Sequence, residues 1–459
     1  MEYISTRNTK ETFSFKDVFL KGLAPDGGLF VPKNIPKYSS QELEKLKNLS
    51  YRDLAKDIIL KFCNDEFSEE EIQDLIKDSY KDFRTQEVVS IRKLDNTNLL
   101  ELFHGPTLAF KDIAMQVIGN MYEKILEKNN LKINIVVATS GDTGAAAISA
   151  IRDRKNMKIF VLHPDEKISE IQRKFMTTVN SSNVFNIALK SNFDDCQKFI
   201  KSMFNDKNFS NTIKMSGVNS INWSRIVIQI VYYFFSYFKI SKKNEKINYS
   251  IPTGNFGDAY AGYIAKRMGL PINKLIIATN SNDILKRVIN TGIYKPSKVQ
   301  HTVSPSMDIQ VASNFERLIF DICSHNSENI LKLMKKLNDH GEFRLTEQEL
   351  NKIKETFFSE SLSETETKSI IKETYEKYKI LIDPHTAVAT GVIKKLPLEG
   401  NTIILATAHP SKFSEVVMKQ TGIKPELPKN LESIISKKEE YIKLSNDLKK
   451  VQNYILEKV

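Results

Sequence analysis

The sequence predicts an α/β protein with two open parallel sheets that are covered by helices on both faces. A β-branched strand pattern at 133–138 is followed by a loop, a helical stretch and a second strand pattern at 158–163. The same order recurs from 247 to 279, and 401–408 adds another apolar strand. Strand–loop–helix–strand units imply parallel pairing, because the helix returns the chain to the end of the sheet at which the first strand began.

The first 84 residues predict a small helical unit in front of these sheets. Residues 41–62 have helical periodicity, and Ser68 with Glu71 has the spacing of a capping box ahead of the next apolar run. A turn region rich in glycine and proline, 22–32, precedes them.

Residues 85–428 form the predicted α/β region, with two subdomains. Its most apolar run, 226–238, is too short to cross a bilayer and contains Gln229, so we expect a buried core helix. The segment 325–380 is polar and rich in Lys and Glu, which predicts helices that face solvent.

Residues 429–459 predict a C-terminal helical tail. Its apolar residues step by 3, 4, 3 and 4, as on one face of an amphipathic helix that packs back on its own domain; they are Tyr441, Leu444, Leu448, Val451 and Ile455.

The composition is that of a globular chain with an excess of positive charge. Of 459 residues, 67 are Lys or Arg and 56 are acidic, so the net charge is +11. A basic chain invites a nucleic-acid partner, but no segment clusters Lys or Arg with aromatic residues, and we expect none. The charge instead follows a composition that is rich in lysine throughout.

Three isolated cysteines, with no CxxC pair and no targeting segment at the N-terminus, favour a reducing, cytoplasmic location. The seven histidines and three cysteines show no metal-ligand spacing, so no metal is predicted. No stretch is apolar enough to span a membrane.

Two glycine-rich loops follow predicted strands and open helices, at 140–144 and 254–258. Glycine lets backbone N–H groups approach a ligand, and the helix N-terminus favours negative charge, so either loop could hold a carboxylate or a phosphate. Neither matches the ATP or the dinucleotide pattern. Each taken alone could also be an ordinary tight turn.

Lys111 follows an apolar run and precedes an amphipathic helix. A lysine in an apolar setting loses its proton more easily and becomes a nucleophilic amine, suited to a Schiff base. Lysines are abundant in this chain, however, and most lysines beside an aspartate are solvated. Local chemistry alone does not decide its role.

Several segments in their order along the chain resemble the threonine synthase family, which belongs to the fold type II (tryptophan synthase β-like) pyridoxal-phosphate enzymes. The segments are YISTRN, SFKDVFLKGLAPDGGLFVP, FHGPTLAFKD, TSGDTGAAA, PTGNFGDAYAGYIAKRMGLPI, ATNSNDIL, SPSMDIQVASNFERL, DPHTAVATGV and LATAHPSKF. The resemblance covers most of the chain and shows no departure at the functional motifs.

The resemblance implies that Lys111 holds pyridoxal 5'-phosphate as a Schiff base. A cup for the cofactor phosphate would consist of Gly254, Asn255, Phe256 and Gly257, with Asp258 completing the turn. Thr407 would face the pyridine nitrogen through its hydroxyl. The carboxylate or phosphate end of the substrate would be held by Ser140, Gly141, Asp142 and Thr143.

Five further residues are candidate ligands of the substrate phosphate, with structural ion pairing as the alternative for each: Arg225, Ser306, Asn314, Arg317 and Lys412. The implied reaction converts O-phospho-L-homoserine and water to L-threonine and phosphate, by elimination of the γ-phosphate and addition of water at Cβ. This is the chemistry of a carbon–oxygen lyase acting on phosphates, in a monomer or weak homodimer. The alternative is another fold type II enzyme, a dehydratase or phospho-lyase acting on a different hydroxy- or phospho-amino acid.

Overall fold

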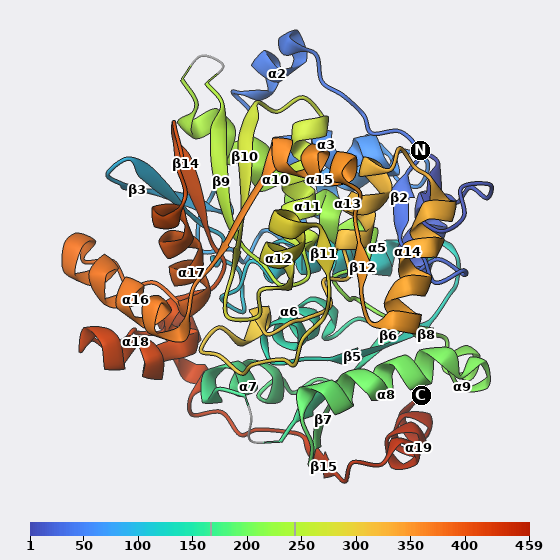
Figure 1. Ribbon diagram of the computed structural model, residues 1–459. Coiled ribbons are helices and arrows are strands. Elements are labelled where there is room, and N and C mark those ends of the chain that lie inside the picture. Colours follow the sequence, from blue (N-terminus) through green and yellow to red (C-terminus); the bar gives the residue numbers. More distant parts are fainter. Residues whose placement is uncertain (166–167, 243–244) are drawn as a thin grey trace.

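Two open sheets lie one above the other in the computed structural model, which describes residues 1–165, 168–242 and 245–459 (Figure 1). The larger sheet has the order β13-β10-β9-β14-β4-β3. Its strands are β13 (Phe357–Ser361), β10 (Ile272–Thr279), β9 (Ile247–Pro252), β14 (Thr402–Ala406), β4 (Thr97–Glu101) and β3 (Ser90–Leu94). All neighbours in it are parallel except β3 and β4, which form an antiparallel hairpin.

The smaller sheet is parallel throughout, with the order β15-β7-β6-β5-β8. Its strands are β15 (Ile442–Leu444), β7 (Val184–Leu189), β6 (Met157–Pro164), β5 (Ile133–Ala138) and β8 (Met215–Ser216). The predicted class, an α/β fold with two open sheets, is therefore confirmed. The remaining strands form two short antiparallel pairs, β1 (Tyr3–Ser5) with β2 (Phe30–Pro32) and β11 (Ile293–Tyr294) with β12 (Phe343–Arg344).

Successive side chains along a strand point to opposite faces of the sheet and pack in different hydrophobic cores. In β14, Ile403 and Leu405 face the central core, whereas Ile404 and Ala406 face a second core under the outer helices. That second core is covered by α16 (Glu364–Tyr378), α17 (Pro384–Val392) and α18 (Ser414–Thr421). Strands buried on both faces are expected where helices cover both sides of a parallel sheet.

The central core lies between the sheets and also receives the N-terminal unit. Its helices are α3 (Tyr51–Cys63), α4 (Glu69–Ser79), α5 (Lys111–Lys128), α6 (Asp142–Ile151), α7 (Glu170–Thr177), α10 (Trp223–Ile240), α11 (Gly257–Arg267), α12 (Ile284–Thr291) and α13 (Phe315–Ile322). The run 226–238 falls in α10, and all of its residues but the last are buried. The prediction of a buried core helix is confirmed. No helix in the described part of the chain is long and apolar enough to cross a membrane.

The N-terminal unit contains the predicted helices and capping box. Residues 41–62 divide into α2 (Ser40–Leu46) and α3, because Ser50 caps a new helix. The side chain of Ser68 accepts from the backbone of Glu71, and the Glu71 side chain accepts from the backbone of Ser68. The unit also contains α1 (Phe15–Lys21) and the β1–β2 pair, which the sequence reading did not predict.

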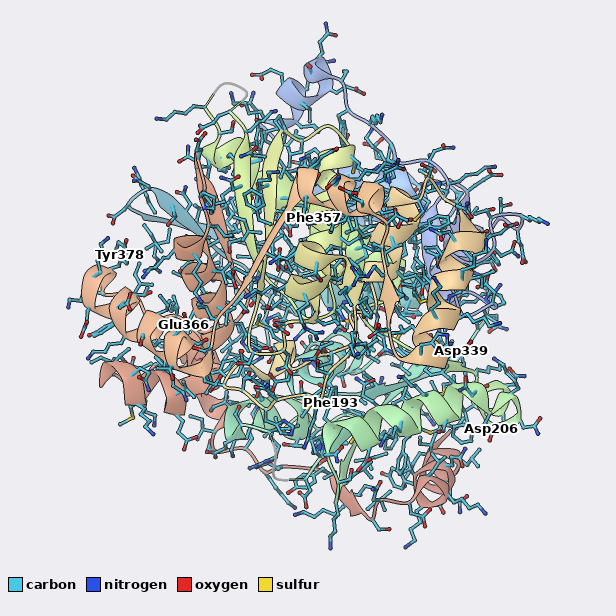
Figure 2. All side chains as sticks on the ribbon, viewed as in Figure 1. Phe193, Asp206, Asp339, Phe357, Glu366 and Tyr378 are labelled. Carbon is cyan, nitrogen blue, oxygen red and sulfur yellow. The ribbon has the colours of Figure 1, made fainter. Side chains whose placement is uncertain are left out.

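The polar segment 325–380 lies at the periphery, where Asp339, Glu366 and Tyr378 mark its helices in Figure 2. It contains α14 (Ser327–His340), α15 (Glu347–Thr356) and α16. Only Ile330 and Leu333 are buried in the fourteen residues of α14, so the expected solvent-facing surface is observed.

The tail is not one continuous helix, and that prediction is wrong. Tyr441 precedes a short strand, β15, which contains Leu444 and adds to the edge of the smaller sheet beside β7. Only the end of the segment is helical, as α19 (Leu448–Lys458). Val451 and Ile455 pack with α8 (Phe193–Asn205) and α9 (Lys207–Thr212) on the outer face of that sheet. A spacing of three and four residues over so few positions did not distinguish a strand and a turn from a helix.

The described ranges also contain four short 3-10 segments: η1 (Pro305–Met307), η2 (Ile393–Lys395), η3 (Pro410–Phe413) and η4 (Lys429–Ile434). Two of them, η1 and η3, carry candidate site residues.

Candidate active site

The carboxyl ends of strands from both sheets converge on one site. The Lys412 ammonium, in the segment after β14, lies 2.6 Å from the Asp142 carboxylate, which follows β5 of the other sheet. Beside it, the Thr407 carbonyl accepts the N–H of Phe110 at 2.8 Å, which places Thr407 next to Lys111. Ligand sites in open parallel sheets form at this edge.

Lys111 is the first residue of α5 and is buried, with 8% of its surface exposed. Its Nζ lies 3.5 Å from Asp142 Oδ2 and 3.4 Å from Ser306 Oγ. Burial lowers the pKa of Lys111; Asp142 opposes this effect, and the positive charges of Lys412 and Arg225 add to it. The amine is thus more nucleophilic than that of a solvated lysine.

Asp142 is held by several groups around its carboxylate. Lys412 and the Gln172 amide, at 2.9 Å, contact Oδ1, and Lys111 lies beside Oδ2. Burial alone would raise the pKa of Asp142, but the charges of Lys412 and Lys111 outweigh it and lower that pKa. A carboxylate held as an anion repels another anion, so only the backbone of Asp142 is suited to the substrate carboxylate or phosphate.

The loop 140–144 presents backbone N–H groups at the start of α6. The Thr139 hydroxyl accepts the N–H groups of Gly141 and Gly144, each at 2.9 Å, and so fixes the loop. Gly141 has φ 131°, a backbone conformation that favours glycine. The Ser140 and Thr143 positions therefore lie at a preformed helix N-terminus.

The loop 254–258 forms a second turn of this kind after β9. Phe256 adopts the left-handed conformation, with φ 63°, and its N–H donates to Thr253 Oγ1 at 3.1 Å. A Cβ at Gly254 would lie 3.0 Å from the Ile309 side chain, so a larger residue would not fit without displacement. Asp258 points away from this loop, since its Oδ1 accepts the hydroxyls of Tyr232 and Tyr233 at 2.5 and 2.9 Å.

Asn314 and Arg317 support this loop, and the expectation that they contact the substrate phosphate needs correction. The Asn314 side chain donates to the Asn255 carbonyl at 3.1 Å, and its Oδ1 accepts from Arg317. The Arg317 guanidinium also donates to the carbonyls of Phe30 and Ile221, at 3.0 and 2.6 Å. Each of its three nitrogens donates one hydrogen bond to the protein itself.

Arg225 differs, because its guanidinium is buried without an acceptor. It lies at the start of α10 and is 4% exposed. Its Nε has no hydrogen-bond partner, and it enters no ion pair among the residues that the structure describes. Burial lowers its pKa to about 10. A buried, unpaired cation is costly, so this position is suited to an anionic ligand.

These features fit pyridoxal phosphate. Lys111 supplies a buried amine, and the turn from Gly254 to Gly257 supplies backbone donors for a phosphate. Arg225 supplies a further buried cation, whose Nε has no acceptor among the described residues, for a second anionic group. The turn contacts the neighbours of both residues. A Cβ at Gly254 would lie 3.2 Å from Met307, which follows the Ser306 that contacts Lys111, and a Cβ at Gly257 would lie 3.6 Å from Ile226, which follows Arg225.

Two supporting residues were not found from the sequence, namely Thr139 and Gln172. Thr139 directly precedes the 140–144 loop, and this position was the available signal that its hydroxyl could bond the N–H groups of the loop. Gln172 lies thirty residues further along, on α7, and no local pattern marks it.

Comparison with known proteins identifies the family of the chain. A model of pyridoxal-phosphate dependent enzymes matches residues 99–407, and models of the threonine synthase N terminus and C-terminal region match 2–80 and 386–455. The chain belongs to the threonine synthase family.

Members of this family are similar over nearly the whole chain. Threonine synthase of Pseudomonas aeruginosa is 40% identical over 99% of this chain and 98% of its own. The crystal structure of PLP-bound threonine synthase from Brucella melitensis, 41% identical, covers 100% of this chain and 99% of its own with a TM-score of 0.96. That of the yeast threonine synthase, 38% identical, covers 100% of this chain and 98% of its own with a TM-score of 0.95. Fold and cofactor class are thereby established as those of the family.

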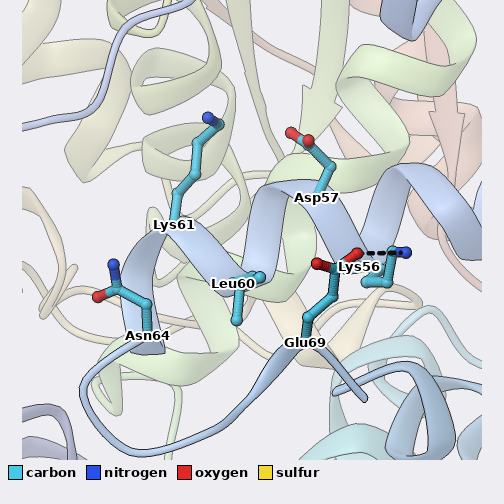
Figure 3. A pocket seen from close by; sticks show the side chains of 6 residues that line it. All are labelled: Lys56, Asp57, Leu60, Lys61, Asn64 and Glu69. Atoms are coloured by element: carbon cyan, nitrogen blue, oxygen red, sulfur yellow. Dashed lines mark hydrogen bonds and ion pairs between the residues drawn. The ribbon is translucent and has the colours of Figure 1, made fainter. Parts of the chain in front are cut away.

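A separate depression of about 260 Å³ lies on the N-terminal unit (Figure 3). It is lined by Lys56, Asp57, Leu60, Lys61, Asn64 and Glu69. Lys56 pairs with Glu69 at 2.9 Å across it. Asp57 accepts the Tyr38 hydroxyl, and the Lys61 ammonium lies 4.5 Å from the centre of the Tyr38 ring. None of these residues belongs to the Lys111 site. Among the described residues no cluster of His, Cys, Asp or Glu could hold a metal ion.

Proposed function

We propose that this protein is a threonine synthase, which converts O-phospho-L-homoserine and water to L-threonine and phosphate by γ-elimination and β-addition of water. The observation that carries the proposal is the unpaired guanidinium of Arg225 beside the buried amine of Lys111. The uncharged glycine turn is sufficient to bind the cofactor phosphate through its backbone N–H groups. A buried guanidinium in the same site is then best explained by a second phosphate, that of the substrate.

The cofactor would be held by residues of the larger sheet. Lys111 would carry it through its amine. The loop of Gly254, Asn255, Phe256 and Gly257 would bind its phosphate at the start of α11. The N–H groups of Gly254, Asn255 and Gly257 would be the donors, because the Phe256 N–H is bonded to Thr253, and the backbone of Asp258 would complete the turn. Thr407 would place its hydroxyl at the pyridine nitrogen. When bound, pyridoxal phosphate supplies an electron sink for a carbanion at the substrate Cα.

The substrate would be bound from both sheets. The loop of Ser140, Gly141, Asp142 and Thr143 suits its carboxylate at the start of α6. The donors would be the N–H groups of Ser140, Asp142 and Thr143 and the two hydroxyls, because the Gly141 N–H is bonded to Thr139. Arg225 would take its phosphate. Lys412 would act through Asp142, because its ammonium already contacts that carboxylate and the Thr107 carbonyl at 2.8 Å.

Lys111 would move the protons of the reaction. Its lowered pKa makes the free amine available to accept the proton at Cα and later to return one. Asp142, 3.5 Å away, stabilises the ammonium that results. Ser306, at 3.4 Å from the same nitrogen, is better placed for this proton transfer than for the substrate phosphate.

A second candidate is a related reaction on a different hydroxy- or phospho-amino acid. One specific observation favours keeping it: human threonine synthase-like 2 is 35% identical over 93% of this chain. A monomer or weak homodimer in the cytoplasm, without nucleic acid or membrane partners, completes the proposal. The three cysteines, which form no disulfide, support the cytoplasmic location within this proposal.

The test is the release of phosphate from O-phospho-L-homoserine by the cofactor-loaded protein, with the amino-acid product identified. We expect threonine and phosphate in equal amounts. Phosphate without threonine, or turnover only of another amino acid, would favour the second candidate.

The Lys111→Ala variant should lose both turnover and the absorbance of the lysine-bound cofactor, because the other amine at the site, Lys412, is held by Asp142 and by the Thr107 carbonyl. Lys128→Ala, an exposed lysine on the same helix, should retain both. A Lys111→Ala protein that kept both properties would overturn the assignment of Lys111.

A further inference from the structure

Ser306 occupies a central position in the site on a segment with little regular structure. It lies in η1, within the long connection between β11 and α13. Its hydroxyl accepts from Lys111 Nζ at 3.4 Å and donates to Asp142 Oδ2 at 3.5 Å. The hydroxyl therefore bridges the amine and the carboxylate, provided that its backbone is held in place.

The backbone of Ser306 is held by a buried histidine. Its N–H donates to Nε2 of His385 at 3.2 Å, and His385 is 3% exposed. This histidine lies in the first turn of α17, far from Ser306 in the sequence. The helix itself is anchored to the larger sheet, because the Ala389 carbonyl accepts the Ser250 hydroxyl at 2.7 Å.

Asp383 determines which ring nitrogen of His385 carries the proton. Its Oδ2 lies 2.7 Å from Nδ1 of His385 and also accepts the backbone N–H of that residue at 2.9 Å. Its Oδ1 accepts the N–H of Thr386 at 3.1 Å and the Thr386 hydroxyl. A carboxylate beside Nδ1 requires a proton there, so Nε2 presents a lone pair to Ser306.

We propose that His385, held as the Nδ1–H tautomer by Asp383, is a positioning residue that fixes Ser306 opposite Lys111. This inference rests on the proposed function, because it assigns a role in the proton transfers of Lys111. His385 itself acts only through Ser306. Hydrogen bonds as long as those of Ser306 tighten when substrate completes a site, and small displacements of positioned groups cost large factors in rate.

The test compares His385→Asn with His385→Gln. The Asn amide reaches the position of Nδ1 and can still donate to Asp383, but it cannot reach Ser306. The Gln carbonyl reaches the position of Nε2 and can accept the Ser306 N–H. We expect kcat to fall about tenfold or more in His385→Asn with KM changed less than about threefold. In His385→Gln we expect kcat within about threefold of the unaltered protein.

Thermal unfolding and cofactor absorbance of both variants separate this effect from loss of fold or cofactor. His340→Gln, an exposed histidine at the end of α14, is the control and should change nothing. Equal kcat values in the Asn and Gln variants, whether high or low, would overturn the proposal.

A second readout needs no turnover. Nitrogen-15 spectra of the histidine rings, with the His385 signals assigned by their loss in His385→Gln, should show a proton on Nδ1 and none on Nε2. A proton on Nε2 contradicts the proposal even if the enzyme is active. If the unaltered protein makes no threonine, the proposed function fails, while the tautomer still tests the positioning of Ser306.

Discussion

Arg225 and Arg317 are two buried arginines in one site region, and they differ in the partners that the protein supplies to their guanidinium groups. Both are nearly inaccessible, and burial lowers the pKa of each to about 10. Arg317 donates to two backbone carbonyls and to Asn314, and its guanidinium lies 5.6 Å from the centre of the Trp223 ring. Arg225 Nε has no acceptor among the described residues. Burial and pKa therefore do not separate a structural arginine from a ligand-binding one, whereas the supply of acceptors does.

The largest expected effect that tests this comparison is on activity at Arg225. Arg225→Gln should lower kcat/KM for O-phospho-L-homoserine about a thousandfold, because it removes one partner of a buried charge pair with the substrate. Its free energy of unfolding should stay within about 1 kcal/mol of the unaltered protein, since an unpaired buried charge contributes no stability. Steady-state kinetics and urea unfolding measure the two quantities. A large loss of stability with unchanged kcat/KM would give Arg225 the structural role instead.

Arg317→Gln should show the opposite pattern. Its removal leaves the carbonyls of Phe30 and Ile221 and the Asn314 side chain without their donor, so the free energy of unfolding should fall by about 3 kcal/mol. The change is measured by urea unfolding of the apo protein, in which cofactor affinity plays no part. Unaltered stability would mean that these hydrogen bonds are not the function of Arg317.

Asp258 provides a pH-dependent measure of the surroundings of Arg225. Burial raises the pKa of Asp258 to about 6, and Arg225 opposes that rise. Because the folded state binds this proton more tightly than the unfolded chain, Asp258 makes stability fall as pH rises from about 4 to 6. Asp258→Asn should remove about 2 kcal/mol of that decrease. Urea unfolding at several pH values compares the two proteins, and parallel profiles would contradict the raised pKa.

The smallest expected effect is the stabilisation of the folded protein by inorganic phosphate, which should differ between the two arginine variants. At ten times its Kd, phosphate stabilises a protein by about 1.4 kcal/mol if it binds only the folded state. We expect this increase in the Arg317→Gln apo protein and a smaller one in Arg225→Gln, which retains only the glycine turn. Thermal shift at constant ionic strength, with sulfate and chloride controls, measures it. Equal increases in both variants would remove Arg225 from the anion site.

The sequence predicted the parts of the molecule that depend on local pattern. The strands around 133–163 and 247–279, the glycine turns and the buried helix at 226–238 all carry their signal within a few residues. The role of Arg317 has no such local signal, because its acceptors are the carbonyls of Phe30 and Ile221, which only folding brings close to it. The motif that contains Arg317 resembles a segment of the family, but the neighbouring residues do not show which groups its guanidinium contacts.

The prediction of a continuous helical tail was wrong, and the role of His385 was not predicted, for the same physical reason. Tyr441 and Leu444 have helical spacing, but β7 offers an open edge that draws the segment into a strand. His385 looks like one more residue of an apolar helix until the fold places Ser306 against its ring. Long-range hydrogen bonding overrides or completes what the local sequence favours.

The position of β14 has a consequence for how this protein is made. β14 is inserted between β9 and β4, so the hairpin of β3 and β4 has no strand to join it to the larger sheet until residue 406 of 459 has left the ribosome. The contact between Thr407 and Phe110 must wait equally long. Residues 90–110 are translated early and must remain unaggregated through most of synthesis, so a nascent chain truncated before β14 would be a client for chaperones rather than a partly active enzyme.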